Sequence, residues 1–445
     1  MTTLPLTLDR TSPVPLGAQL AGRVRELIGR GTLDVGDRLP STRALALDLG
    51  VSRTIAEQAY DQLVAEGWLE ARRGSGTHVA ASPLRNETPR RSHPPRSARD
   101  TGLVRLDTGT PWIDPRHRDG WRRAWREVST LEPPAGYPDP CGVPELREAL
   151  ADHLARTRGL ACTADQIVIT SGTTDGLRQL LTVLGPGSLA VEDPGYRAAV
   201  MVARGLGRSV VDVAVGPAGL DLHGVPPDAA AVYVTPAHQH PTGVTLPAGA
   251  RVALLEHARR HDIVVVEDDY DSEFRYDVAP LPALATLDPD RVVYLGTASK
   301  SVAPGLRLGW LVAPPSTVEA ISDLLRRTHD LPSWPTQRAY LAMLRDGHVG
   351  RLIRSARRVY AARGAAVERD LPVEGPVAGM YVALPLSAGQ TRGAVRAAKE
   401  AGFELPTLDE YARSHGRTGV VFGFGGLSDA EFERALAAIA GAVRN

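Results

Sequence analysis

Lys300 is the residue whose type and setting most clearly suggest covalent chemistry. Of the 51 basic residues in the 445-residue chain, only Lys300 and Lys399 are lysines, and all the others are arginines. A guanidinium cannot replace a primary amine that condenses with a carbonyl group, so Lys300 is a candidate for a Schiff base. It follows the apolar run 292–295 and precedes Arg307, where an anion could bind. The alternative is that Lys300 is simply one of two leftover surface lysines.

Polar residues also follow four other short apolar runs, each of which predicts a β-strand. Because these runs alternate with helical patterns, the sequence predicts an α/β fold with a mostly parallel sheet, in which ligands bind beyond the carboxyl ends of the strands. The residues expected there are Ser171, Gly172 and Thr173 after run 167–169, Tyr196 after run 189–191, His238 and His240 after run 232–234, and Asp268 and Tyr270 after run 263–266.

Together these strand ends carry the groups that hold pyridoxal phosphate. The set comprises an amine, a carboxylate, a phenol, an aromatic ring and a glycine-containing turn that offers amides to a phosphate. The carboxylate would keep the ring nitrogen protonated, and the phenol would hydrogen-bond the ring oxygen. Each group alone is common in α/β proteins, whereas their occurrence in this order at five strand ends is specific.

The first 80 residues predict a separate small unit. Apolar residues from Leu16 to Ile28 recur at helical spacing, a second helix opens at Pro40–Ser41 and stops at Gly50, and Ser52 caps a third. Two short strands, 68–71 and 77–79, follow. This order predicts a helix-turn-helix with a β-hairpin wing.

The runs 36–43, 49–54 and 67–69 resemble the winged helix-turn-helix of the GntR family over about sixty residues. Residues 1–80 carry nine basic and nine acidic residues, so placement of the arginines, and not net charge, favours DNA. The alternative is a helical interaction module that binds no DNA. The resemblance implies double-stranded DNA contacts from Arg43, Arg53, Thr54, Arg73 and Gly74, with Ser41 and Ser52 reaching phosphates.

Residues 81–103 predict a linker, because they are rich in proline and arginine and have no apolar periodicity. Such a segment is an extended tether whose charge also favours contact with the DNA backbone, or it is a plain spacer. We therefore expect three parts: residues 1–80, the linker 81–103, and residues 104–445, the last with a large part at about 150–320 and a small part at about 321–445.

From about Leu106 the sequence resembles the fold-type I, aspartate aminotransferase-like family. With the front unit it resembles the MocR/GabR-type subfamily of GntR regulators. The resemblance implies a mostly parallel sheet with a smaller C-terminal α+β subdomain, and a homodimer. It further implies Lys300 as the internal aldimine, Asp268 at the pyridine nitrogen, Tyr270 near the ring oxygen, Tyr196 stacked on the ring, His238 nearby, and a phosphate site of Ser171, Gly172, Thr173, Thr297, Arg307 and the partner subunit's Tyr137.

Two positions depart from the aminotransferase pattern. His240 stands where aminotransferases carry asparagine, and Val421 stands where an arginine would bind the substrate carboxylate. An apolar side chain cannot bind a carboxylate in the bidentate way of an arginine, and only Arg417 is near. Unless Arg417 takes that place, an ordinary amino-acid substrate has no anchor.

Composition limits the cellular setting. Basic and acidic residues balance at 51 each, two cysteines suit a reducing compartment, and no apolar stretch is long enough to span a bilayer. The histidines are too scattered for a metal site.

We expect a cytoplasmic regulator that binds pyridoxal phosphate and senses it or a small amine. One alternative is a working aminotransferase with a DNA-binding front end. Another is a dimerisation scaffold that has lost the cofactor.

Overall fold

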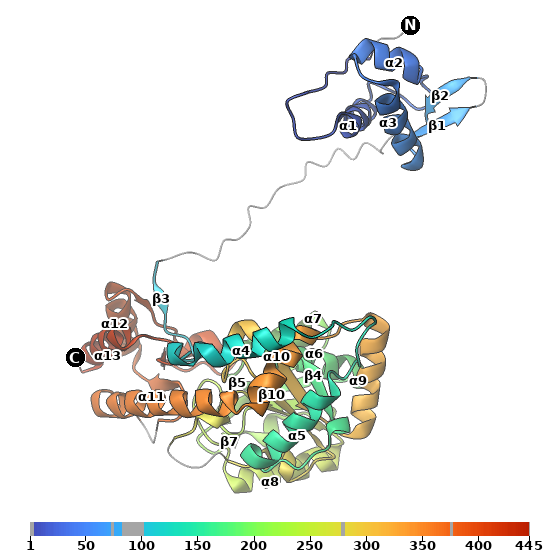
Figure 1. Cartoon of the computed structure of the whole chain (residues 1–445). Helices are drawn as coiled ribbons and strands as arrows, with labels where there is room; N and C mark the ends of the chain where they lie inside the picture. Colours follow the sequence, from blue (N-terminus) through green and yellow to red (C-terminus); the bar gives the residue numbers. More distant parts are fainter. Residues whose placement is uncertain (1–3, 73–74, 82–101, 277–280, 374–376, 445) are drawn as a thin grey trace. The chain divides into compact units, whose positions relative to one another are not determined.

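The computed structural model describes residues 4–72, 75–81, 102–276, 281–373 and 377–444 (Figure 1). The chain divides into two compact units, Met1–Arg99 and Asp100–Asn445. Most of the predicted linker 81–103 and the wing residues Arg73 and Gly74 lie outside the described residues.

The first unit has the predicted winged helix-turn-helix. Ser41 and Ser52 cap the second and third helices, because each hydroxyl accepts a hydrogen bond from the backbone three residues later, and Gly50 ends the second helix at φ 60°. Leu20, Val24 and Leu63 lie in its apolar core. Its elements are α1 (Leu16–Gly29), α2 (Thr42–Leu49), α3 (Arg53–Ala65) and the antiparallel pair β1 (Leu69–Arg72) and β2 (Gly76–Val79).

The second unit is built on an eight-stranded sheet, and the five strands predicted from apolar runs are confirmed. Its order is β4-β11-β10-β9-β8-β5-β6-β7, with β11 and β7 antiparallel to their neighbours. The strands are β4 (Ile167–Thr170), β5 (Leu189–Asp193), β6 (Val210–Gly216), β7 (Gly219–Leu220), β8 (Ala231–Val234), β9 (Val264–Asp269), β10 (Val292–Thr297) and β11 (Gly309–Val312).

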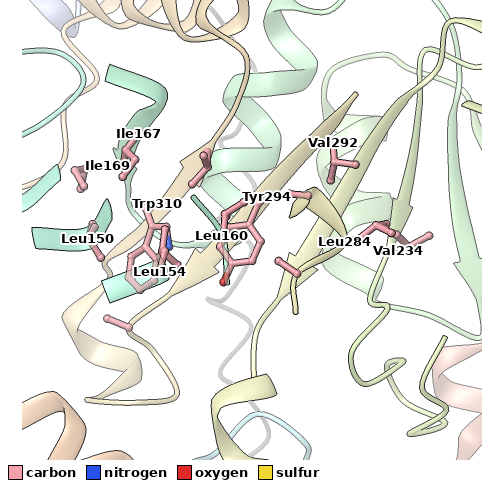
Figure 2. Packing of buried hydrophobic residues seen from close by; sticks show 14 of the residues in the cluster. Leu150, Leu154, Leu160, Ile167, Ile169, Val234, Leu284, Val292, Tyr294 and Trp310 are labelled. Atoms are coloured by element: carbon pink, nitrogen blue, oxygen red, sulfur yellow. The ribbon is translucent and has the colours of Figure 1, made fainter. Parts of the chain in front are cut away.

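Helices cover both faces of this sheet. Successive side chains along a strand point to opposite faces, and each face contributes to its own apolar core. Ile167, Ile169 and Tyr294 belong to one core (Figure 2), whereas Val168 and Leu295 belong to the other. The first core is covered by α4 (Arg118–Ser129), α5 (Pro144–Arg158), α8 (Ala248–His261) and α10 (Trp334–Arg345), and the second by α6 (Thr173–Val183), α7 (Arg197–Gly205) and α9 (Pro315–Thr328).

A smaller C-terminal subdomain has its own core and begins with the long helix α11. Its core also contains Leu106, because β3 pairs in parallel with β13. The earlier helices α9 and α10 pack on the large sheet. The subdomain consists of α11 (His348–Asp370), β12 (Tyr381–Pro385), α12 (Ala388–Glu400), β13 (Phe403–Glu404), β14 (Gly419–Gly423) and α13 (Asp429–Val443), with β3 (Val104–Arg105).

Within the described ranges, no helix combines the length and the apolar character that crossing a bilayer requires.

Gly309 sets the close approach of β11 to the turn before α6. A Cβ at this position would lie 2.7 Å from the Cα of Gly172 and 2.7 Å from the carbonyl oxygen of Gly296, so backbone would have to move. We predict that Gly309→Ala lowers the free energy of unfolding of the second unit by about 1–3 kcal/mol, measured by denaturant titration. Gly249→Ala in α8, where a Cβ meets nothing within 4 Å, is the control and should be neutral; equal stability of the two variants would contradict this reading.

Candidate functional site

A cavity of about 230 Å³ lies at the carboxyl ends of the parallel strands. The register of β9 with β10 sets Asp268 opposite Leu295, which brings the residues after both strands to the same edge. The cavity is lined by Thr108, Gly109, Gly172, Thr173, Thr174, Tyr196, Thr235, His240, Asp268, Tyr270, Thr297, Ser299, Lys300, Pro304 and Arg307.

Lys300 reaches into this cavity from the segment after β10. Its Nζ donates a hydrogen bond to the carbonyl oxygen of Gly109 at 2.5 Å. Burial lowers the pKa of the Lys300 ammonium, although Asp107, Asp271 and Asp268 oppose that effect. A lower pKa makes a larger fraction of the amine neutral, which is the nucleophilic form.

Asp268 is buried with one oxygen that lacks a partner. The hydroxyl of Tyr233 donates to Oδ2, whereas Oδ1 has no hydrogen-bond partner among the residues that the structure describes. Burial raises the pKa of Asp268 to about 7. A cationic hydrogen-bond donor at Oδ1 would satisfy that oxygen and favour the ionised carboxylate.

Another part of the cavity lining, formed by the turn before α6 and by Arg307, is suited to an anion. Gly172, at φ +117°, precedes the first residue of α6, and a Cβ there would lie 3.5 Å from Nη1 of Arg307. Thr297 lies close by, and its Oγ1 accepts a hydrogen bond from the backbone of Ser299 at 3.1 Å. Within the described chain no carboxylate forms an ion pair with Arg307. A helix N-terminus, hydroxyls and an unpaired guanidinium together form a site for a phosphate.

Two tyrosines with different surroundings also line the cavity. The ring of Tyr196 is stacked on that of Tyr233 with centroids 6.5 Å apart, and its hydroxyl is 3.3 Å from Oγ1 of Thr174. The hydroxyl of Tyr270 lies 2.6 Å from that of Tyr381 and 3.0 Å from the carbonyl oxygen of His238. Tyr196 therefore offers a ring face, whereas Tyr270 offers a hydroxyl.

The two histidines occupy different places. His238 is buried behind Tyr270, outside the cavity lining, and its Nδ1 is 2.7 Å from Oδ2 of Asp271. His240 lines the cavity, where its Nε2 lies 2.9 Å from Oγ1 of Thr108 and its Nδ1 has no partner in the described part of the chain. Burial, with Lys300 and His238 nearby, lowers the pKa of His240 to about 3, so its ring is neutral.

Two other predicted residues lie outside the lining of this cavity. Ser171 precedes the cavity turn, and its backbone donates to Oδ2 of Asp175 at 2.9 Å. Tyr137 is 76% exposed, with its ring stacked on His329 at 4.5 Å between centroids. A tyrosine this exposed is available to another molecule.

The departure at Val421 has a clear structural consequence, and the nearby Arg417 does not take the place of the missing arginine. Val421, in β14, is fully buried in an apolar cluster with Met380, Tyr381 and Tyr411. The guanidinium of Arg417 donates to the carbonyl oxygen of Val215 on β6 and does not line the cavity. Among the described lining residues, Lys300 and Arg307 are the only lysine and arginine, so no further cation is present to hold a carboxylate.

Sequence reasoning missed several residues of the cavity wall. Thr108 and Gly109 come from the segment between β3 and α4, far from the predicted strand ends in sequence, and no local pattern marks them. Thr174 and Ser299 adjoin predicted residues and could have been included as further hydroxyls near a phosphate. Only the tertiary structure brings these segments together.

On the first unit, the predicted DNA-contacting residues described by the structure lie on the surface. Arg43, Arg53 and Thr54 are exposed, and Arg53 forms a 2.7 Å ion pair with Glu57. Sequence reasoning did not select Arg38, which forms an antiparallel bridge with His78 of the wing and whose Nε lies 3.2 Å from the position of a Cβ on Gly76, beside the turn of the hairpin. Arg38 therefore joins the helix-turn-helix to the wing.

Comparisons with known proteins match both units. Residues 16–79 match the bacterial regulatory proteins of the gntR family, and residues 103–439 match aminotransferase class I and II. The chain is 36% identical to the HTH-type pyridoxine biosynthesis transcriptional regulator PdxR of Corynebacterium glutamicum, with 99% of this chain and 98% of that protein covered. The chain belongs to the MocR-type GntR regulators.

Further comparisons match most of this MocR-type regulator or the fold of its large unit. It is 35% identical to the probable rhizopine catabolism regulatory protein MocR of Rhizobium meliloti, over 80% of this chain and 77% of that protein. An archaeal alanine:glyoxylate aminotransferase superposes with a TM-score of 0.68 at 25% identity, covering 77% of this chain and 91% of that one. The regulator is thus a helix-turn-helix transcriptional regulator with an aminotransferase-class domain.

The buried acids of this domain predict a pH dependence of stability. Burial raises the pKa values of Glu192, Glu267 and Asp268 to about 7, so between about pH 4.5 and 7 the folded regulator holds protons that the unfolded chain has released. Their contribution to stability is therefore lost as pH rises through about 7.

We predict that Asp268→Asn makes the free energy of unfolding of the ligand-free protein less dependent on pH. The stability of the variant relative to wild type should rise by about 2–3 kcal/mol between pH 5 and pH 8, because the buried carboxylate that ionises in wild type over this range is absent. Denaturant titrations at both pH values measure the difference. Parallel pH profiles for the two proteins would contradict the prediction.

Proposed function

We propose that this chain is a homodimeric regulator of the bacterial cytoplasm that binds pyridoxal phosphate in the cavity, covalently linked to Lys300, and changes its affinity for operator DNA in response. The observation that carries the proposal is a partly buried amine of lowered pKa in the same cavity as a buried carboxylate oxygen that lacks a partner in the described part of the chain. Arg307, which has no ion-pair partner among the described residues, lines the same cavity.

The groups present fit the cofactor. Oδ1 of Asp268 is available to a protonated pyridine nitrogen, which would satisfy it and stabilise its charge. The space between Gly172 and Arg307 suits a phosphate, since a side chain at the glycine would fill it. The ring of Tyr196 and the hydroxyl of Tyr270 are available to the ring face and the ring oxygen.

The protein side chains supply binding and orientation. Pyridoxal phosphate supplies an electrophilic aldehyde and, through its protonated ring, an electron sink. Lys300 provides the neutral amine for the aldehyde, and Gly109 holds that amine by its carbonyl oxygen. Asp268 keeps the ring proton, while Arg307, Thr297 and the start of α6 orient the phosphate.

The effector we propose is pyridoxal phosphate itself. The described cavity lacks a third cation to hold an amino-acid carboxylate, because Val421 is packed among tyrosines and Arg417 is bound to Val215. The regulator from Corynebacterium glutamicum that is similar over the full length is named for pyridoxine biosynthesis. Both observations support control of genes for vitamin B6 supply.

The exposure of Tyr137 supports a dimer in which this residue reaches the phosphate of the partner subunit. For operator binding, we propose base or phosphate contacts from the second and third helices and from the wing. The residues are Ser41, Arg43, Ser52, Arg53, Thr54, Arg73 and Gly74.

We predict that Lys300 carries the cofactor. Wild-type protein incubated with pyridoxal phosphate should develop a visible absorption band, and borohydride should then fix one phosphopyridoxyl group on the peptide that contains Lys300. Lys300→Ala should show neither the band nor the label, because Lys300 provides the only amine in the cavity lining. Absorbance spectra and peptide mass spectrometry measure both.

Lys399 offers a matched control, because it is the only other lysine of the chain and lies exposed on α12. Lys399→Ala should keep the band and the label. Labelling of Lys399 in place of Lys300, or an unchanged band in Lys300→Ala, would contradict the proposal.

For DNA binding, we predict that Arg43→Ala and Arg53→Ala each weaken binding by about 1–3 kcal/mol. The probe is a duplex selected by wild-type protein from a random pool, and affinity is measured by fluorescence anisotropy at fixed salt. Arg23→Ala on α1 removes an exposed arginine paired with Glu26 and serves as control. An equal loss from Arg23→Ala would mean that the effect is general electrostatics and not these contacts.

A further inference from the structure

Tyr381 connects the C-terminal subdomain to the hydroxyl of Tyr270. It is the first residue of β12, only 1% exposed, and its hydroxyl lies 2.6 Å from that of Tyr270. Its other polar contact is the carbonyl oxygen of Gln239, at 3.3 Å. The contact with Tyr270 is the shorter of the two and thus the stronger hydrogen bond.

The number of available protons decides how these two tyrosines are arranged. The 2.6 Å contact needs the proton of one of the two phenols, and each phenol also has a carbonyl oxygen that can only accept. The carbonyl oxygen of His238 is closer to Tyr270, at 3.0 Å, than that of Gln239 is to Tyr381, at 3.3 Å. We therefore assign the proton of Tyr270 to His238 and the proton of the shared contact to Tyr381. If a ligand in the cavity receives the Tyr270 proton instead, Tyr381 can still donate to the same oxygen.

The backbone holds Tyr381 in this position. Gly379, at φ +70°, precedes β12, and a Cβ there would lie 3.0 Å from Oδ2 of Asp271 and 3.1 Å from Cε1 of His238. The absence of a side chain therefore lets β12 approach the segment after β9. The ring of Tyr381 lies 4.8 Å from that of His238, centroid to centroid.

We propose that Tyr381 is a positioning residue for the ring oxygen of bound pyridoxal phosphate: by donating to Tyr270, it makes Tyr270 a stronger and correctly directed donor to that oxygen. The inference rests on the proposed function, since it assumes the cofactor in this cavity. In a chain of two hydrogen bonds, the bond that Tyr270 accepts from Tyr381 strengthens the bond that Tyr270 donates. The ionised ring oxygen is therefore stabilised more than it would be by Tyr270 alone. The C-terminal subdomain thereby contributes to cofactor binding without lining the cavity.

Other ionisable groups surround Tyr270 and Tyr381. None of them is changed in the variants compared below. They come from every element packed around it: Glu192 on β5, His238 and His240 after β8, Asp268 on β9, Asp271 after β9, Lys300 after β10 and Tyr411 ahead of β14.

The test is the pH dependence of the visible absorption band of the full-length protein loaded with pyridoxal phosphate. The lysine nitrogen and the ring oxygen of the bound cofactor share one proton. When fewer hydrogen bonds stabilise the ionised ring oxygen, this proton is lost only at higher pH. Tyr381→Phe should therefore raise the apparent pKa of the band by about 0.5–1 unit, the equivalent of one neutral hydrogen bond. Tyr270→Phe should raise it further in the same direction.

A double variant separates positioning from a general structural effect. In the Tyr270→Phe background, Tyr381→Phe should cause no additional shift, because its effect passes through the Tyr270 hydroxyl. Tyr360→Phe is the matched control: Tyr360 is fully buried in the same apolar cluster, but its hydroxyl accepts from the backbone of Trp112 at 2.7 Å. It should leave the apparent pKa unchanged.

The outcomes distinguish this inference from the proposed function. A normal Lys300-dependent band with an unchanged apparent pKa in Tyr381→Phe overturns the role of Tyr381 alone. An equal shift in the Tyr270→Phe background, or in Tyr360→Phe, also overturns it, since the effect then does not pass through Tyr270. If wild-type protein develops no Lys300-dependent band, both proposals fail.

Discussion

The parallel pairing of β9 and β10 is the constraint on which the cavity depends. It brings the ends of both strands to one edge, where buried Asp268 and partly buried Lys300 line the same cavity. Burial acts in opposite directions on the two groups, since it lowers the pKa of the amine and raises that of the carboxylate. Both shifts disfavour charge in the cavity. A ligand with an electrophilic carbon at one position and a cationic nitrogen at another would relieve both.

Much of this arrangement could be predicted from the sequence, because strands of a parallel sheet are apolar on both faces and their polar ends stand out. Asp268 was predicted in this way, and Lys300 from the scarcity of lysine together with its place after a strand. Ser41 and Ser52 were predicted because helix caps have local signatures. The insertion of β11 between β4 and β10 was not predicted, since strand order is set by contacts distant in sequence. Tyr381 was missed for the same reason, because it meets Tyr270 across 111 residues.

The surroundings of Val421 indicate how an aminotransferase-class fold can serve as a sensor. The same apolar cluster that buries Val421 contains Tyr381, whose hydroxyl contacts Tyr270. The position that would hold a substrate carboxylate is therefore part of the packing between the subdomain and the site. Regulation requires that the ligand bind two conformations of the protein with different affinity. A tyrosine pair that joins the subdomain to the cavity provides a contact on which such a difference can depend.

The central claim is that occupancy of the cavity changes the affinity for DNA. It is tested most directly by measuring the dissociation constant for a selected operator duplex while pyridoxal phosphate is titrated, with cavity occupancy followed by absorbance in the same samples. The account predicts that the dissociation constant changes over the range of concentration in which the absorption band saturates, and by about fivefold or more, as expected for a coupling of about 1 kcal/mol or above. A dissociation constant that stays the same from the empty to the saturated cavity would contradict it.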